Sequence, residues 1–319
     1  MAAVLKAYFP SVKIAFMGRA YTKAVIESCI YVDEFIDVTD FMSKPVTVCG
    51  EVPQAIIHVL PKPEIAKRSK QLKIPLRIGT RNRLYHWRTC NKLVKLSRKN
   101  SDLHEAQLNL ILLSALGIEQ LYERADIGSL YGMERITPLQ KEFAAIIQKD
   151  KYNLIIHPKS QGNGREWPLE KFAALIEVID REKTQVFISG TEKERKLLDE
   201  LFDKVGDRVT DITDKMSLPQ FISFIKSCDG LLASGTGPLH IAAALGKDAL
   251  GLFPPIRPVH PGRWEPLGPG AKVFVSSRKC GKCKDVKTCR CMNEIKPEQV
   301  NAVIEQLATQ TAISSSQMF

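Results

Sequence analysis

The chain has 319 residues, of which 44% are hydrophobic and 25% are charged; this mixture excludes a largely disordered or fibrous chain. The length predicts two domains, each large enough to bury a core. The formal net charge is +11 and the isoelectric point is near 9.2, so an anionic partner has to be considered.

The sequence predicts neither a membrane-spanning helix nor a signal peptide. No stretch approaches the roughly 18 apolar residues that a membrane-spanning helix needs. Lys6 and Pro10 interrupt any apolar run that would serve as the core of a signal peptide. Four cysteines stand singly in apolar surroundings, as reduced thiols do: Cys29, Cys49, Cys90 and Cys228. We therefore expect a cytoplasmic protein.

In both halves, short apolar runs alternate with helical patterns, which is typical of βαβ units around a parallel sheet. In the first half the pattern predicts strands over 12–17, 35–38, 46–48 and 55–59, and a helix over 20–28. The apolar spacing over 103–116 predicts another helix, with Gly117 as its C-cap.

The second half is more regular. It predicts strands over 154–157, 186–189 and 230–233, and helices over 138–148, 192–202, 218–227 and 239–245. A further helix begins at Pro168, with a buried stripe formed by Phe172, Leu175, Ile176 and Ile179. We expect a first domain over 1–150, a second over 151–311, and a flexible tail over 312–319.

The strongest motif is the segment 233–240, Ala-Ser-Gly-Thr-Gly-Pro-Leu-His. A buried strand is predicted to turn through Gly235 and Gly237 into a helix, whose N-terminal N–H groups would hold a phosphate. Thr236 adds a hydroxyl, and His240 falls in the first turn, where it could donate to an anion. The alternatives are a plain strand-to-helix connection and a histidine that merely packs.

Two further loops repeat this arrangement. The loop 157–168 offers Ser160 and Arg165 to an oxygen-rich ligand, although it could be a solvated loop anchored by Trp167. In the loop 189–194, a carboxylate could accept both hydroxyls of a ribose, or a Glu there could simply favour the start of a helix. Three such loops indicate a nucleotide-phosphate ligand, while a dinucleotide fingerprint and a P-loop are both absent.

The positive charge is concentrated in one segment. Between residues 62 and 99 the chain has thirteen basic residues and the single acid Glu64, a balance of +12. Such a segment is either a solvated basic loop or a surface for an anion. Nucleic acid is a rival partner, but Tyr85 and Trp87 are the only stacking aromatics here and no nucleic-acid module is recognisable. We therefore expect no nucleic-acid partner.

Taken in order and spacing, several motifs resemble glycosyltransferase family 9, the ADP-heptose:lipopolysaccharide heptosyltransferases, over nearly the whole chain. They are Gly79 after the strand 76–78, the Arg-Glu-Trp-Pro of 165–168, the Asp-Lys-Met-Ser-Leu of 214–218, and the segment 236–246.

This resemblance implies an α/β fold of the GT-B type, in which two Rossmann-like doubly wound domains face a cleft and the second binds an ADP-heptose donor. Residue by residue, Ser160 would face the diphosphate, and Arg165 would replace the family's usual lysine as a supporting catalytic and donor-binding group. Glu194 would hold the ribose and Met216 would lie against the adenine. The diphosphate and sugar would contact Gly235, Thr236, Gly237 and His240. The implied reaction is an inverting transfer without a metal or other cofactor, in which cations and helix dipoles stabilise the leaving diphosphate.

Two features depart from the family pattern. Gly235 stands where the family normally has Asp, which removes a sugar contact. Family members also open with a strand and a Gly-Asp loop whose Asp is the general base, whereas residues 1–10 resemble the helix after that loop. We expect this catalytic Asp to lie before Met1. Either the chain starts late by about twenty residues, so that the first domain lacks its opening strand, or it is a degenerate paralogue that binds nucleotide sugar without turnover.

On the acceptor side, the resemblance implies that the first domain takes the lipopolysaccharide core. Arg81, Arg83 and Arg88 in the basic segment are candidates for binding its carboxylates and phosphates. The same segment would give peripheral contact with the inner face of the inner membrane.

Four cysteines lie close together near the C-terminus: Cys280, Cys283, Cys289 and Cys291. Zinc is one interpretation, but their spacing is not that of a zinc ribbon or finger. A similar cysteine-bearing segment occurs in family 9 without implying a metal, and we expect none.

Overall fold

The computed structural model describes residues 1–160, 164–278 and 289–316. The chain divides into two compact units, Met1–Arg135 and Ile136–Phe319, whereas the sequence prediction set the boundary after residue 150. Two hydrogen bonds join the segment that follows residue 135 to the rest of unit 2. The Gln140 N–H donates to Gln220 Oε1 at 2.9 Å, and Gln220 Nε2 donates to the Pro138 carbonyl at 3.0 Å.

Unit 1 contains two small parallel sheets, β1-β2 and β3-β4-β5. Its strands are β1 (Ala15–Gly18), β2 (Glu34–Asp37), β3 (Ala55–Ile57), β4 (Leu76–Thr80) and β5 (Lys92–Val94). Its α-helices are α1 (Ala2–Tyr8), α2 (Lys23–Glu27), α3 (Val38–Ser43), α4 (Pro63–Gln71), α5 (His86–Thr89), α6 (Glu105–Ile111) and α7 (Arg124–Ile127). Short 3-10 turns accompany them at Ala20–Thr22, Leu112–Leu116 and Gly128–Leu130.

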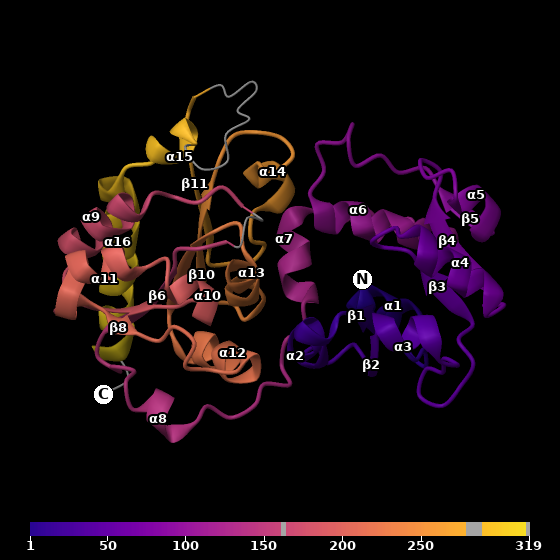
Figure 1. The fold of residues 1–319 in the computed structure, drawn as a ribbon, viewed down its shortest axis with the longest axis horizontal. Helices are drawn as coiled ribbons and strands as arrows, with labels where there is room; N and C mark the ends of the chain where they lie inside the picture. Colours follow the sequence, from indigo (N-terminus) through magenta and orange to yellow (C-terminus); the bar gives the residue numbers. More distant parts are fainter. Residues whose placement is uncertain (161–163, 279–288, 317–319) are drawn as a thin grey trace. The chain divides into compact units, whose positions relative to one another are not determined.

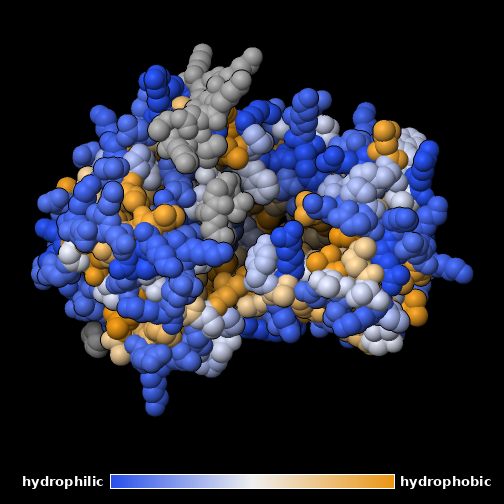
Figure 2. All heavy atoms as spheres, in the orientation of Figure 1, coloured by the Kyte–Doolittle hydropathy of each residue, from blue (hydrophilic) through white to orange (hydrophobic). Residues whose placement is uncertain are grey.

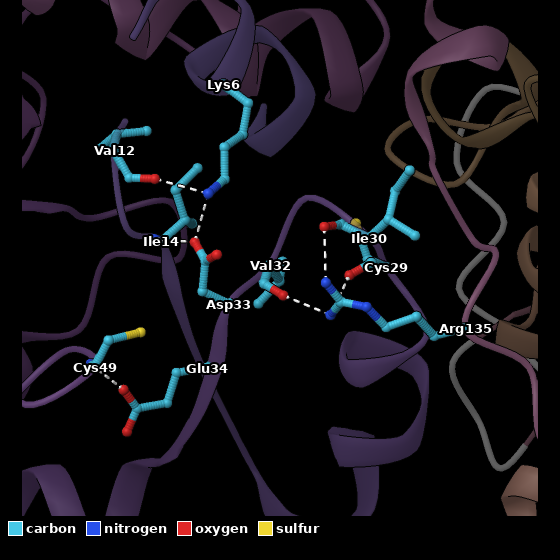
Figure 3. Close-up of polar contacts among 10 residues, drawn as sticks. All are labelled: Lys6, Val12, Ile14, Cys29, Ile30, Val32, Asp33, Glu34, Cys49 and Arg135. Carbon is cyan, nitrogen blue, oxygen red and sulfur yellow. Dashed lines mark hydrogen bonds and ion pairs between the residues drawn. The ribbon is translucent and has the colours of Figure 1, made fainter. Parts of the chain in front are cut away.

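Polar contacts fasten the ends of unit 1 (Figure 3). Lys6 Nζ on α1 lies 2.7 Å from Asp33 Oδ2, just before β2, and also donates to the Val12 carbonyl. At the other end of the unit, the Arg135 guanidinium donates to the carbonyls of Val32 and Ile30 at 2.8 and 2.9 Å. The last residue of the unit is therefore bound to the loop before β2.

Unit 2 is built on one six-stranded parallel sheet with the order β11-β10-β9-β6-β7-β8. Its strands are β6 (Tyr152–His157), β7 (Thr184–Ile188), β8 (Thr210–Asp211), β9 (Gly230–Ser234), β10 (Asp248–Phe253) and β11 (Ala271–Val275). Counted from β6, this is the 3-2-1-4-5-6 order of a Rossmann fold, with its reversal between β6 and β9.

Helices cover both faces of this sheet (Figure 1). The α-helices of unit 2 are α8 (Lys141–Ala144), α9 (Leu169–Val178), α10 (Glu192–Arg195), α11 (Asp199–Val205), α12 (Leu218–Ser227), α13 (Gly237–Ala244), α14 (Pro261–Trp264), α15 (Arg290–Asn293) and α16 (Pro297–Ser316). One face packs against α9, α11 and α16, and the other against α12 and α13. The predicted stripe of α9 is buried, and Trp167 just before it is fully buried, its Nε1 donating to the Ile295 carbonyl at 3.2 Å.

Several predicted elements differ in the structure. The strand expected over 46–48 is absent, and Val48 forms only an isolated bridge with Glu51 across a turn where Cys49 and Gly50 have φ of 51° and 87°. Cys49 is also exposed rather than packed in apolar surroundings. The helix expected over 192–202 is broken into α10 and α11, because Leu198 leaves helical geometry and is fully buried.

Two further differences concern helix length. The helix expected over 138–148 is limited to the single turn of α8. At the other end, α16 continues to Ser316, past the start of the tail predicted from residue 312. Among the described residues, no helix is both long enough and apolar enough to cross a bilayer.

Candidate functional site

The reversal of strand order between β6 and β9 positions the candidate site of unit 2. His157 at the end of β6 pairs in register with Ala233 on β9, so both strands end at the same edge of the sheet. The loops that leave such a pair diverge to opposite faces, and ligands of open α/β sheets bind in the crevice between them. The two strongest sequence motifs are these two loops.

The β9–α13 turn contains two buried hydroxyls that lack a partner. Ser234 is 0% and Thr236 is 7% exposed, and neither Oγ of Ser234 nor Oγ1 of Thr236 has a hydrogen-bond partner among the described residues. A buried polar group left in this way costs about 1–3 kcal/mol. Both hydroxyls lie beside the start of α13 at Gly237, where N–H groups and the helix dipole favour an anion. The turn is therefore suited to a phosphate.

Packing leaves no room for a side chain at Gly235 in this turn. A Cβ at this position would lie 2.8 Å from Cε1 of Phe253, which is itself fully buried at the end of β10. A side chain at residue 235 thus requires Phe253 to move. The sequence showed that a glycine stands where the family normally has Asp. It could not show the reason, because the Phe253 ring that excludes a side chain lies on another strand.

The β6–α9 loop is organised by Glu166, which belongs to the Arg-Glu-Trp-Pro motif but was not among the predicted site residues. Glu166 Oε1 accepts from the Ser160 N–H at 2.9 Å and lies 3.2 Å from Ser160 Oγ, while Glu166 Oε2 lies 2.7 Å from Lys159 Nζ. A Cβ on Gly164 would lie 3.4 Å from the Gly235 carbonyl oxygen. The loop that bears Ser160 and Arg165 therefore contacts the β9–α13 turn.

The loop after β7 reaches the same edge through His157. His157 Nδ1 lies 3.0 Å from Ser189 Oγ. Burial lowers the pKa of His157, whereas the charges of Glu194 and Glu166 oppose that change. Glu194 is buried and its Oε2 accepts from the Thr191 N–H at 2.7 Å, so in this structure it caps α10. This is the alternative that the sequence left open for Glu194, and its contact with a ribose stays a prediction.

Met216 and His240 complete the predicted set. Met216 is half-buried in the loop after β8, which is joined to the loop after β7 by the Asp214 N–H to Gly190 carbonyl bond of 2.9 Å. His240 is half-buried in the first turn of α13, and burial lowers its pKa to about 4. Its ring is therefore neutral at neutral pH and can donate one N–H. The predicted residues of unit 2 thus lie on neighbouring loops at one edge of its sheet.

The predicted cationic residues of unit 1 lie after β4. Arg81, Arg83 and Arg88 are exposed, and none forms an ion pair with the residues that the structure describes. Other cations of the basic segment have structural roles. Arg77 donates to the Thr89 carbonyl at 2.8 Å, and Arg68 to the Lys44 carbonyl at 3.0 Å. Fewer of the basic side chains are therefore free to donate directly to an external anion, although the net charge of the segment is unchanged.

Gly79, the remaining motif of unit 1, has a packing role. A Cβ at this position would lie 2.7 Å from His86 Nδ1 and 2.8 Å from Cys90 Sγ. His86 is fully buried, and its Nδ1 accepts from the Thr80 N–H at 2.9 Å. The glycine therefore lets α5 dock against the end of β4.

Of the clustered cysteines, Cys289 and Cys291 are buried in the apolar core beside α9 and α16. Cys280 and Cys283 lie outside the described residues. The described residues contain no group of three or more side chains suited to hold a metal ion.

Comparison with known proteins gives a consistent family. A family model described as glycosyltransferase family 9 (heptosyltransferase) matches residues 69–293. A Haemophilus influenzae protein named as a candidate glycosyltransferase is 23% identical over 297 residues, which cover 88% of this chain and 84% of that protein. The lipopolysaccharide heptosyltransferase 1 of Campylobacter coli is 30% identical over 112 residues, or 34% of this chain and 33% of that protein.

Solved structures agree on the fold. The glycosyl transferase family 9 structure from Veillonella parvula superposes with a TM-score of 0.76 at 18% identity, covering 97% of this chain and 92% of that one. The ADP-heptose heptosyltransferase II of E. coli gives a TM-score of 0.71 at 16% identity, covering 97% and 93%. The predicted α/β fold of GT-B type, with Rossmann-like domains, is confirmed. Since the family model spans more than half of the sequence, the chain belongs to glycosyltransferase family 9.

Proposed function

We propose that this chain transfers heptose, or a related sugar, from an ADP-activated donor to the inner core of lipopolysaccharide, with inversion and without a metal. The names of its relatives support heptose and lipopolysaccharide as the substrate classes. Unit 2 would bind the donor and unit 1 the acceptor.

One observation carries the proposal for the donor. The β9–α13 turn places the buried, unpartnered hydroxyls of Ser234 and Thr236 beside the N-terminus of α13, at the reversal point of a Rossmann sheet. A diphosphate there would accept from both hydroxyls and from helix N–H groups. Loss of ADP leaves negative charge on the diphosphate, so the same donors would stabilise the transition state. Arg165 would add a positive charge on the other side of the crevice.

For the acceptor, we infer that Arg81, Arg83 and Arg88 bind anionic groups of the lipopolysaccharide core. All three are exposed and lie after β4. An acceptor of this kind is anchored in a bilayer, so the enzyme would work as a cytoplasmic protein in peripheral contact with the inner membrane. The attacking hydroxyl also needs a carboxylate base to take its proton.

The donor site is tested by isothermal titration of ADP into the 319-residue chain and into Thr236→Val. Valine keeps the shape of threonine but removes the hydroxyl, so ADP affinity should fall about tenfold, the value of one hydrogen bond to a charged group. Thermal stability should be unchanged or slightly higher, because an unpartnered buried hydroxyl is removed. Equal ADP affinity in both proteins would contradict this placement of the diphosphate.

The second candidate function is a nucleotide-sugar-binding protein without turnover. Release of ADP from ADP-heptose in the presence of a core-lipid acceptor separates the two functions. Turnover supports the transferase, whereas ADP binding with no product supports the binding-only alternative.

A further inference from the structure

The segment after β4 presents two large apolar side chains to solvent. Leu84 is 87% exposed and Trp87 is 60% exposed. The backbone N–H of Trp87 donates to the Leu84 carbonyl at 3.2 Å, so the two residues are one helical turn apart and lie on the same side of that turn. His86 between them is fully buried and accepts from the Thr80 N–H. The buried histidine therefore anchors the turn with Leu84 and Trp87 directed outward.

The indole of Trp87 is held in place, because its Nε1 donates to the Arg81 carbonyl at 2.9 Å. Isolated apolar residues are common on soluble proteins, and Figure 2 shows hydrophobic residues scattered over a mostly hydrophilic surface. Exposure alone therefore assigns no role to these two side chains. The charged residues near them indicate a role.

Exposed cations lie close to this apolar pair along the chain. Arg81, Arg83 and Arg88 are exposed and lack ion pairs among the described residues. The Arg81 N–H bonds to the Val94 carbonyl at 3.0 Å, which brings the exposed Lys95 close to the same turn. The only acid between residues 62 and 99 is Glu64. An exposed apolar pair with uncompensated cations nearby in the chain is complementary to an anionic surface with an apolar interior.

We propose that Leu84 and Trp87 insert into the interfacial region of an anionic lipid bilayer, to which Arg81, Arg83 and Arg88 attract the turn when they hold no acceptor. Trp is enriched at this depth, and the Arg81 carbonyl satisfies the indole N–H of Trp87 so that its large apolar ring can leave water. Interfacial binding grows with buried apolar area and with attraction between basic residues and anionic lipid. The inference deepens the proposed function, which places the acceptor in a membrane, but it requires neither donor nor acceptor.

The test is sedimentation of the full chain with vesicles of phosphatidylcholine alone or of equal parts phosphatidylcholine and phosphatidylglycerol. The parent should bind the anionic vesicles far better, and Leu84→Ser/Trp87→Ser should weaken that binding by about tenfold or more. The matched control is Tyr21→Ser/Leu121→Ser, since these residues are 71% and 78% exposed elsewhere in unit 1. The control should bind like the parent.

A second measurement uses lipids with brominated acyl chains, which quench only inserted indoles. Anionic brominated vesicles should quench the parent more than Trp87→Phe. Absence of this difference, or equal vesicle binding by the Leu84/Trp87 variant and the parent, would overturn the proposal in favour of purely ionic contact. ADP titration of the same variant separates this result from the donor proposal, because unit 2 is unchanged and its ADP affinity should match the parent's.

Discussion

His240 offers a direct test of the donor site. It lies in the first turn of α13, and burial lowers its pKa to about 4, against about 6.5 for an exposed histidine. We therefore expect a neutral ring in the free protein at pH 7. A diphosphate placed beside the start of α13 would favour the charged ring and raise its pKa.

The magnitude follows from the pKa difference. A lowering of about 2.5 pH units, at about 1.4 kcal/mol per unit, corresponds to about 3 kcal/mol. Because the folded pKa is below the unfolded one, folding favours the neutral ring. This contribution is fully present above pH 6.5 and is lost as the pH falls towards about 4. Bound ADP should stabilise the imidazolium, and should therefore raise the pKa of His240 and reduce this loss of stability at low pH.

The assay is an NMR titration of ring-labelled histidine, without and with saturating ADP. The chain has six histidines, and His240→Gln identifies the resonance of His240 by its loss. We expect a pKa near 4 in the free protein and a clear rise with ADP. His86, which is buried in unit 1, serves as the control whose pKa should not respond. A free pKa at or above 6.5, or no response to ADP, would refute the reasoning.

Two further predictions concern packing and acid stability. Gly235→Asp should cost about 1–3 kcal/mol in urea unfolding, because its Cβ meets the Phe253 ring; adding Phe253→Leu should recover part of that loss, and strictly additive losses would show that the ring is not the cause. His58 is buried, and burial, followed by the nearby His86 and Arg77 charges, lowers its pKa to about 4. The parent should therefore lose up to about 3 kcal/mol more stability than His58→Gln as the pH falls from 6.5 to 4; parallel stability curves for the two proteins would count against it.

The local elements of unit 2 were largely determined by sequence. A continuous apolar run predicted β6 and β9, and the apolar spacing predicted α12 with its observed bounds of Leu218–Ser227. Gly117 marked a real helix end, since its φ is 79°. These features depend on periodicity and backbone freedom, which neighbouring residues fix. The family resemblance rested on the same local motifs, and the family match confirmed it.

Other local predictions failed because distant contacts decided them. Residues 192–202 have a helical pattern, but the helix is interrupted before Asp199, next to the fully buried Leu198. The run 46–48 has β-forming residues, yet a left-handed turn at Cys49 and Gly50 leaves only one bridge. Propensity describes a segment alone, and tertiary packing overrides it.

For the site, the sequence named the motifs, and the tertiary structure decided what each side chain does. Ser160, Glu194 and Gly235 were all found by their place after a strand. Only the folded chain shows Ser160 bound to Glu166, Glu194 capping α10, and Gly235 enforced by Phe253. Likewise, the basic segment was visible as charge, but its exposed apolar pair was not. Sequence order fixes which residues follow a strand, whereas partners brought together from other strands and loops fix their hydrogen bonds, burial and exposure.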